Sequence, residues 1–262
     1  LGGKAIGAAE FTSVRLFSGA LVLLCILKVN GNTRSTTKGS WSAAFMLFLY
    51  AVTFSFAYLT LNTGTGALIL FGSVPITMIL KSLFSGNRLL PIEWRGVVTA
   101  FSGMGYLVRP GVTAPSFPGF SLMALAGIAW GLYTLKGRGS TSPLSDTAYN
   151  FLRSVPFAIV LALLFFKNAH ASREGVLLAI ISGGITSGIG YTLWYMALRG
   201  ISATQAAVVQ LSVPVIAAFG GVVFVSEHVS LRLTLSALLT LGGILMVILG
   251  RNVKNRKTPH LR

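Results

Sequence analysis

Two prolines stand in the middle of long apolar segments, where each would free a backbone carbonyl for contact with a solute. Pro75 lies within residues 64–84 and Pro214 within residues 203–225. Proline removes one helical hydrogen bond, which a membrane helix tolerates where the freed group faces protein or a water-filled cavity. We therefore expect the pair to line a solute path; helix distortion that helps packing is the alternative.

Polar side chains inside apolar segments are the next candidates, because burying them in a membrane is costly unless they are paired or hydrated. Gln210 precedes Pro214 by one turn and could hydrogen-bond either a solute or a neighbouring helix. Arg15 could hold an anionic group bidentately, but its place near the start of a segment favours a structural role. Asn150 and Arg153 lie in the first turns of theirs, where snorkelling to the interface is expected.

Aromatic side chains gather in several of these segments and could line a cavity for a partly apolar or cationic solute. Aromatic residues also form belts at membrane interfaces, and Trp194 and Tyr195 lie close enough to Arg199 for that interpretation. The candidate substrate-binding residues are Phe71, Pro75, Tyr133, Tyr191, Trp194, Tyr195, Gln210 and Pro214.

The acidic and histidine residues suggest no catalytic or metal-binding arrangement. All eight fall at predicted helix ends or in connectors: Glu10, Glu93, Asp146, Glu174, Glu227, His170, His228 and His260. A proton relay or an intramembrane enzyme would need such groups at mid-membrane. The sequence therefore predicts no enzyme, no metal site and no cofactor.

The composition indicates a membrane protein. Of 262 residues, 53% are hydrophobic and 10% are charged, whereas soluble domains carry about 25% charged residues. The formal charge of +16 would suit a nucleic-acid binder, but the lysines and arginines sit mainly in short connectors and a terminal run. We therefore expect the lipid bilayer and a small-molecule substrate as partners, and no nucleic acid; a homodimer is left open.

Long apolar blocks define the expected elements, since a membrane helix needs about 20 predominantly apolar residues. Short connectors with turn-forming residues separate the blocks, so consecutive helices should be antiparallel neighbours. The fold class is thus an all-α polytopic membrane bundle. Its nine expected helices are 11–28, 41–61, 64–84, 91–108, 119–135, 147–166, 176–198, 203–225 and 231–250.

The chain also repeats itself with a separation near 140 residues. Placing Pro75 on Pro214 aligns the stretch before it, and after a one-residue gap the same alignment matches two stretches that follow. Five helices per copy would give the copies opposite orientations in the membrane. The predicted domains are a first repeat (1–111), a second repeat (112–250) and a basic tail (251–262). The first repeat holds one helix fewer than the second, so we expect a tenth helix upstream of Leu1. The stretches that align are Phe56-Ala57-Tyr58-Leu59 with Tyr195-Met196-Ala197-Leu198, Asn87-Arg88-Leu89 with Glu227-His228-Val229, and Ser102-Gly103 with Gly242-Gly243.

The distribution of basic residues predicts the orientation, since cytoplasmic connectors are enriched in lysine and arginine. With a cytoplasmic C-terminus, fourteen of these residues lie on the cytoplasmic side and five on the other. We expect an integral protein of the bacterial inner (plasma) membrane with its C-terminus in the cytoplasm.

The order and spacing of several stretches resemble the EamA-like branch of the drug/metabolite transporter superfamily. This resemblance implies ten helices, two cytoplasmic termini, and export or exchange of small metabolites through a central cavity. Asn87-Arg88 departs from the family, which often has a glutamate there, as Glu227 is in the second half. The stretches are Val14-Arg15-Leu16-Phe17, Ala129-Trp130-Gly131-Leu132-Tyr133-Thr134, Trp194-Tyr195-Met196-Ala197-Leu198 with Ser202-Ala203-Thr204 and Pro214, and Ser226-Glu227-His228-Val229-Ser230.

We therefore expect a secondary transporter that moves a small organic metabolite, such as an amino acid or related solute, by alternating access. Two halves would rock about a midplane cavity. A membrane scaffold or sensor that keeps the fold without transport is the main alternative. An intramembrane enzyme would require a nucleophile and base from the upstream helix.

Overall fold

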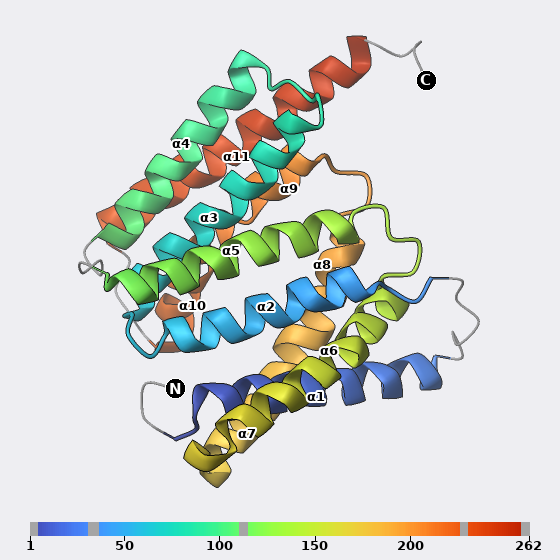
Figure 1. The fold of residues 1–262 in the computed structure, drawn as a ribbon. Coiled ribbons are helices and arrows are strands. Elements are labelled where there is room, and N and C mark those ends of the chain that lie inside the picture. Colours follow the sequence, from blue (N-terminus) through green and yellow to red (C-terminus); the bar gives the residue numbers. More distant parts are fainter. Residues whose placement is uncertain (1–4, 31–36, 110–114, 226–229, 258–262) are drawn as a thin grey trace. The chain divides into compact units, whose positions relative to one another are not determined.

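A computed structural model describes residues 5–30, 37–109, 115–225 and 230–257. Within these ranges the chain forms helices at all nine expected places (Figure 1). The part of the repeat that aligns Glu227 and His228 lies outside the described residues. The helices are α1 (Ala8–Val29), α2 (Trp41–Ala57), α3 (Thr63–Phe84), α4 (Pro91–Val108), α5 (Phe117–Gly137), α6 (Pro143–Phe165), η3 (Phe166–Asn168), α7 (Arg173–Ile181), η4 (Ser182–Ile189), α8 (Gly190–Ala197), α9 (Ala203–Val209), α10 (Ser212–Val225) and α11 (Leu231–Lys257).

Hydropathy and serine caps explain where these helices form. Within the described residues, seven stretches are long and apolar enough to cross a membrane, with α7, η4 and α8 forming one of them; α2 is a shorter apolar helix. The hydroxyls of Ser40, Ser116, Ser172 and Ser202 each accept a backbone N–H at the start of the helix that follows. Such caps satisfy donors that a helix start leaves open. The prediction of an all-α membrane bundle is confirmed.

The chain divides into two compact units that do not coincide with the two sequence repeats. Unit 1 comprises Leu1–Leu61 and Pro115–Ile201, and unit 2 comprises Asn62–Ala114 and Ser202–Arg262. Each unit therefore takes helices from both halves of the chain. The reason is that helices in equivalent positions pack on each other: α1 on α6 in unit 1, and α3 on α9 and α4 on α11 in unit 2.

The contact between α4 and α11 shows how the repeats are related. A Cβ on Gly103 would lie 2.7 Å from the Thr240 backbone nitrogen, and one on Gly243 would lie 2.5 Å from that of Ala100. In the alignment that places Gly103 on Gly243, Ala100 is placed on Thr240. Gly103 against Thr240 and Gly243 against Ala100 are therefore the same contact, made once from each repeat.

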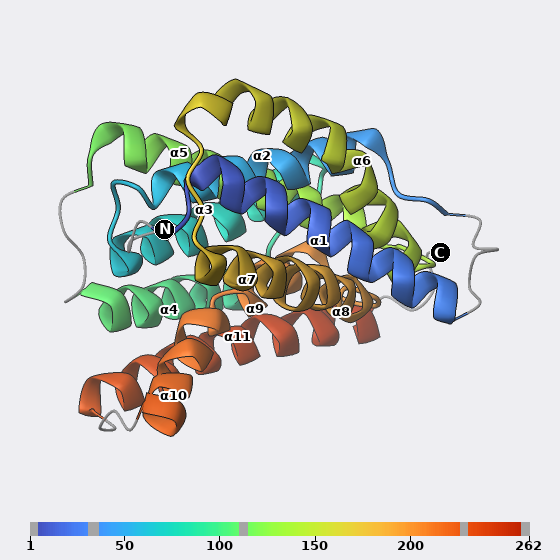
Figure 2. The ribbon, with the colours of Figure 1, turned by 90° about the horizontal axis from the view of Figure 1, so that it is seen from below.

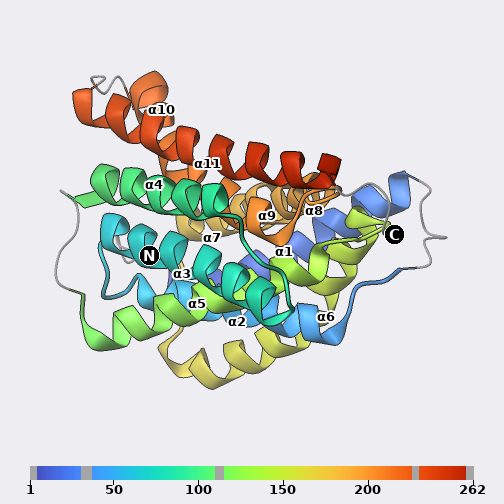
Figure 3. The same ribbon diagram turned by 90° about the horizontal axis from the view of Figure 1, so that it is seen from above.

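The direction of this packing identifies an inverted repeat. Early residues of α4 meet late residues of α11, as in the approach of Gly250 to Ile92, so the two helices run antiparallel, side by side (Figures 1 and 3). A two-fold axis along the helices would make equivalent helices parallel, whereas an axis across them makes them antiparallel. The axis therefore lies across the helices, as in inverted-topology repeats.

The last helix is longer than the sequence predicts. Its apolar stretch ends at Gly250 as expected, but α11 continues to Lys257. Lysine and arginine are good helix formers, so the backbone continues its helix into the basic stretch that follows.

Candidate functional site

Arg15 is the centre of a polar cluster inside unit 1. Its side chain is 7% exposed. The guanidinium donates from Nε to Ser187 Oγ at 2.8 Å and from Nη2 to Tyr191 Oη at 2.6 Å. Its central carbon lies over the rings of Tyr50 and Phe54, at 5.6 and 5.7 Å from their centroids. Every contact described for this cation therefore involves an uncharged group.

A π-helical segment and the helix that continues it bring Ser187, in η4, and Tyr191, in α8, to Arg15. These residues are four apart, so both face the same side, one turn from each other. The segment, η4, lies directly on α1, since a Cβ on Gly183 would overlap the carbonyl oxygen of Arg15 and the hydroxyl of Ser18. π-helical turns inside α-helices are frequent at functional sites. Glycine at 183 is thus what allows the hydroxyls to reach the guanidinium.

Aromatic rings extend from this cluster. Trp130 lies with its ring centroid 4.5 Å from that of Tyr191 and 4.9 Å from that of Tyr50. Tyr133 continues the row at 5.5 Å from Trp130, and Tyr195 follows at 5.0 Å from Tyr133. Trp130 and Tyr191 are half-buried, as is Phe54, whereas Tyr50, Tyr133 and Tyr195 are buried. The row therefore has exposed surface at Trp130 and Tyr191.

A second polar group lies around Tyr133. This residue is fully buried, and within the described residues its hydroxyl and that of Thr147 make no close hydrogen bond, although they lie near each other and near Asn150. Asn150, 1% exposed, accepts the Ser40 N–H at 2.9 Å through Oδ1. Buried polar groups are normally satisfied, so the hydroxyls mark a place suited to water or to a polar part of a solute.

The predicted aromatic residues of the second half therefore come together in unit 1. Trp194 donates from Nε1 to Thr134 Oγ1 at 3.3 Å, and Tyr195 donates from its hydroxyl to the Tyr133 carbonyl at 3.1 Å. Tyr195 is 1% exposed, so the interfacial-belt interpretation of this residue is wrong.

The other predicted site residues lie in unit 2. Pro75 is buried and Phe71 is half-buried on α3. Gln210 is buried and donates from Nε2 to Met78 Sδ at 3.2 Å, as well as to the Ala206 carbonyl at 3.4 Å. Gln210 therefore joins α9 to α3.

The two equivalent prolines have different effects on the backbone. Pro214 lies just after a break, because α9 ends at Val209 and α10 begins at Ser212. Proline has no N–H to donate to Gln210; the Gln210 carbonyl instead accepts from Val213 at 3.2 Å. Pro75, by contrast, lies inside the continuous helix α3. Only the second proline thus accompanies an interruption of its helix.

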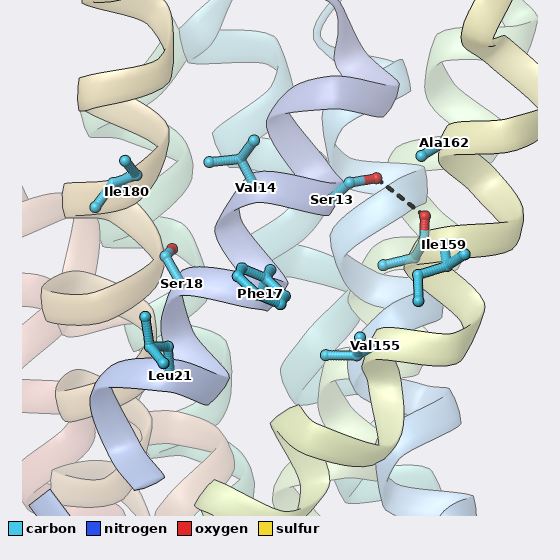
Figure 4. Close-up of a pocket in the computed structure, with 10 residues that line it drawn as sticks. Ser13, Val14, Phe17, Ser18, Leu21, Val155, Ile159, Ala162 and Ile180 are labelled. Carbon is cyan, nitrogen blue, oxygen red and sulfur yellow. Dashed lines mark hydrogen bonds between the residues drawn. The ribbon is translucent and has the colours of Figure 1, made fainter. Parts of the chain in front are cut away.

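An apolar groove of about 410 Å³ lies on unit 1 between α1, α6 and α7, which are side by side in Figure 2. Figure 4 shows Phe17, Leu21, Ile159 and Ile180 along it, with Ser13 bonded to the Ala158 carbonyl at 3.1 Å. At about 100° per residue, Ser13 and Phe17 project from the side of α1 opposite Arg15, whereas Ser18, which also lines the groove, lies about 60° from it. The groove lining does not include Arg15, Ser187 or Tyr191.

Two sequence-based interpretations need correction. Arg15 was expected near a helix start, but α1 begins at Ala8 and places it two turns inside. Asn150 was expected to snorkel, but α6 begins at Pro143, so this residue is buried. Both errors come from helix starts a few residues too late. The pair of hydroxyls one turn apart in a glycine-rich segment, Ser187 and Tyr191, was the signal that could have drawn attention to Arg15.

Metal-binding clusters are not found in the part of the chain that the structure describes: no three His, Cys, Asp or Glu side chains come together there.

Long apolar helices whose equivalent members pack antiparallel define an integral membrane protein of the inverted-repeat class, to which many secondary transporters belong. Residues 117–249 match the EamA-like transporter family. The chain belongs to this family.

Two relatives and one solved structure are similar to this chain over most of its length. The chain is 45% identical to the uncharacterized protein PA1977 of Pseudomonas aeruginosa over 94% of its own length and 86% of that protein's. It is 22% identical to the uncharacterized transporter YoaV of Bacillus subtilis, covering 90% and 85% of the two chains. A crystal structure with 19% identity superposes with a TM-score of 0.78 over 95% of this chain and 91% of the other, which establishes the fold.

Proposed function

We propose that this protein is a secondary transporter that moves a small organic metabolite across the membrane by alternating access. Family membership supports a transport role. The observation that carries the proposal is the pair of half-buried rings, Trp130 and Tyr191, at the buried cation Arg15. A solute with an apolar body would contact Trp130 and Tyr191, and Phe71, Pro75, Trp194, Gln210 and Pro214 remain proposed contacts.

The packing of equivalent helices indicates which parts of the protein could move as rigid bodies during transport. Rocking one sequence half against the other would separate α1 from α6 and α4 from α11, which are in close contact. Motion between the two compact units would leave these contacts intact. We therefore propose that the units, rather than the sequence halves, are the rigid bodies of the transport cycle.

The proposed location is the bacterial inner membrane with a cytoplasmic C-terminus. The connectors near the two ends of α1 make separate contacts, which supports placing these ends on opposite faces of the membrane. Near its start, Gly7 donates to the His170 carbonyl at 2.9 Å. Beyond its end, the connector residue Gly39 donates to Asp146 Oδ1 at 2.8 Å.

This orientation can be tested by labelling single cysteines, in a background in which Cys25 is replaced by serine, at Ala171 and at Thr36, the latter outside the described residues. We expect Thr36 to react from the cytoplasm and Ala171 from the opposite side. Labelling of both from one side would contradict the topology.

A scaffold or sensor that keeps the fold without transport is the second candidate. Flux separates the two: the full chain, reconstituted in proteoliposomes, would be tested with a panel of radiolabelled amino acids, organic acids and organic amines. We expect concentration-dependent, saturable flux of at least one class above protein-free liposomes. Absence of flux for every class, with folded protein in the membrane, would favour the scaffold.

A further inference from the structure

We propose that Arg15, Ser187 and Tyr191 together bind the anionic group of the transported solute, so that the substrate class is an organic carboxylate with an apolar or planar body. This inference rests on the proposed transport function and specifies its substrate. It also assigns a recognition role to Arg15, which the sequence alone favoured as structural.

The first argument is charge. Burying a cation without a counter-charge is costly in a membrane protein, yet the partners described for Arg15 are uncharged: the hydroxyls of Ser187, Tyr191 and Tyr50, and two rings. The acids within the described residues lie elsewhere, each in the first turn of its helix: Glu10, Glu93, Asp146 and Glu174. Glu10, on the same helix, is about 140° around it from Arg15. A solute anion would provide the missing counter-charge.

The second argument is the supply of donors. A guanidinium has five N–H groups, and the hydrogen bonds to Ser187, Tyr191 and Tyr50 leave others for a ligand. The hydroxyls of Ser187 and Tyr191 accept from Arg15 and so hold the guanidinium in place. An oxyanion beside the cluster could therefore receive hydrogen bonds from the remaining guanidinium N–H groups, and bonds of this charge-assisted kind are the strong ones.

The third argument concerns the rest of the solute. Trp130 and Tyr191 are half-buried rings in contact with each other, and Tyr191 also accepts a hydrogen bond from the cation. An apolar or planar body joined to the anion would cover these faces, while the anion reaches Arg15. One guanidinium carries a single positive charge, which matches a carboxylate better than a doubly charged phosphate ester.

Binding to the purified full chain provides the test. The probes share one ring: phenylacetate, its neutral amide phenylacetamide, and phenyl phosphate. Thermal stabilisation and tryptophan fluorescence would be measured for the wild type, Arg15→Gln, Arg15→Lys and Tyr191→Phe. Arg95→Gln is the matched control, because Arg95 is an exposed arginine of α4 in unit 2.

We expect phenylacetate to bind at least tenfold more tightly than phenylacetamide, and more tightly than phenyl phosphate. Arg15→Gln should weaken phenylacetate binding about ten- to a hundredfold, as loss of a charge-assisted hydrogen bond would, with phenylacetamide unchanged. Arg15→Lys, which keeps the charge, and Tyr191→Phe should have intermediate effects, and Arg95→Gln none. If Arg15→Gln does not fold, the two milder variants carry the test.

Equal binding of phenylacetate and phenylacetamide by the wild type would overturn the anion site, as would wild-type carboxylate affinity in all three site variants. Tighter binding of phenyl phosphate would overturn the choice of carboxylate. Because binding is measured independently of flux, the carboxylate site and the transport function can be contradicted independently of each other. Arg15-dependent carboxylate binding without transport would contradict only the transporter, and flux of neutral solutes without carboxylate preference would contradict only this inference.

Discussion

Unit 1 and unit 2 each contain a place where glycine lets two helix backbones nearly touch, and the two places hold different side chains. In unit 1, Gly183 of η4 meets α1 at Arg15, and the side chains around the contact are a guanidinium, hydroxyls and aromatic rings. In unit 2, Gly243 of α11 meets α4 at Ala100, where Val97, Met104 and Val247 are buried.

This difference separates a binding role from a structural one. Small residues are the usual means by which membrane helices approach closely, so glycine alone does not identify a site. The unit 2 contact joins equivalent helices of the repeat, and its buried polar side chain, Thr240, is uncharged, so the contact stabilises the fold. The unit 1 contact holds a cation near accessible rings and is suited to a ligand.

The largest expected effect is in unit 2. Gly243→Val would place a Cβ 2.5 Å from the Ala100 nitrogen and the Gly96 carbonyl oxygen, and backbone atoms cannot move aside cheaply. We expect a loss of about 3 kcal/mol or more, at the upper end for overpacking, measured as a lower unfolding temperature in detergent. Gly242→Val is the control, because nothing lies within 4 Å of a Cβ there. Equal losses in both variants would show that valine's helix propensity, not the contact, is responsible.

Gly183→Ala tests the corresponding contact in unit 1. Its Cβ would overlap the Arg15 carbonyl and the Ser18 hydroxyl. We expect destabilisation of about 1–3 kcal/mol and, because α1 must shift at Arg15, lower solute affinity in the folded fraction. Gly190→Ala, whose Cβ meets only the Ile185 carbonyl oxygen at 3.9 Å, should change neither. A variant as stable and active as the wild type would mean that η4 adjusts freely.

Tyr191→Phe sharpens the comparison by removing one atom from the cluster. The ring contacts with Trp130 remain while the acceptor for Arg15 is lost, so we expect carboxylate affinity to fall about tenfold, for a hydrogen bond to a charged group of about 1.5 kcal/mol. Tyr195→Phe is the control, since its hydroxyl bonds only to the Tyr133 carbonyl among the contacts described. It should cost about 1 kcal/mol of stability and leave affinity unchanged. An affinity loss confined to Tyr195→Phe would move the site away from Arg15.

Gln210→Leu is expected to have the smallest effect. It keeps the bulk but removes the amide, and if Gln210 contacts solute, loss of a hydrogen bond worth about 0.5–1.5 kcal/mol should lower transport affinity roughly two- to tenfold. Gln205→Leu removes a helix cap instead, because Gln205 Oε1 accepts the Ser202 N–H at 2.8 Å; stability should fall while affinity persists. Normal transport by Gln210→Leu would indicate that Gln210 has a structural role, through contacts such as its bond to Met78.

The sequence predicts the helices well because membrane spans depend on long apolar stretches, which composition alone reveals. The repeat was also recoverable, and the alignment that places Gly103 on Gly243 is the one in which the two contacts between α4 and α11 are equivalent. What could not be read was which helices pack together. The two compact units mix the repeats, and tertiary packing that joins residues more than a hundred positions apart leaves no local pattern.

The site was only partly predictable for a related reason. The sequence predicts Tyr133, Tyr191, Trp194 and Tyr195 as candidate aromatic contacts, with an interfacial belt as the alternative for Trp194 and Tyr195, and the structure brings them together in unit 1. Arg15 was undervalued because a helix start misplaced by three residues moves a side chain by almost one turn, which decides between interface and interior. The π-helical turn that directs Ser187 toward Arg15 has no sequence signature beyond its glycines.

The most direct test of the comparison is flux per folded protein in proteoliposomes, measured for one transported carboxylate in Arg15→Gln and Gly103→Ala. Gly103 belongs to the α4 and α11 contact, where a Cβ would lie 2.7 Å from the Thr240 nitrogen. We predict that Arg15→Gln lowers the specific flux at least tenfold at limiting solute, whereas Gly103→Ala lowers the amount of folded protein and leaves the specific flux near that of the wild type. Unchanged specific flux in Arg15→Gln, or a larger loss in Gly103→Ala, would contradict the assignment of binding to unit 1 and of structural support to unit 2.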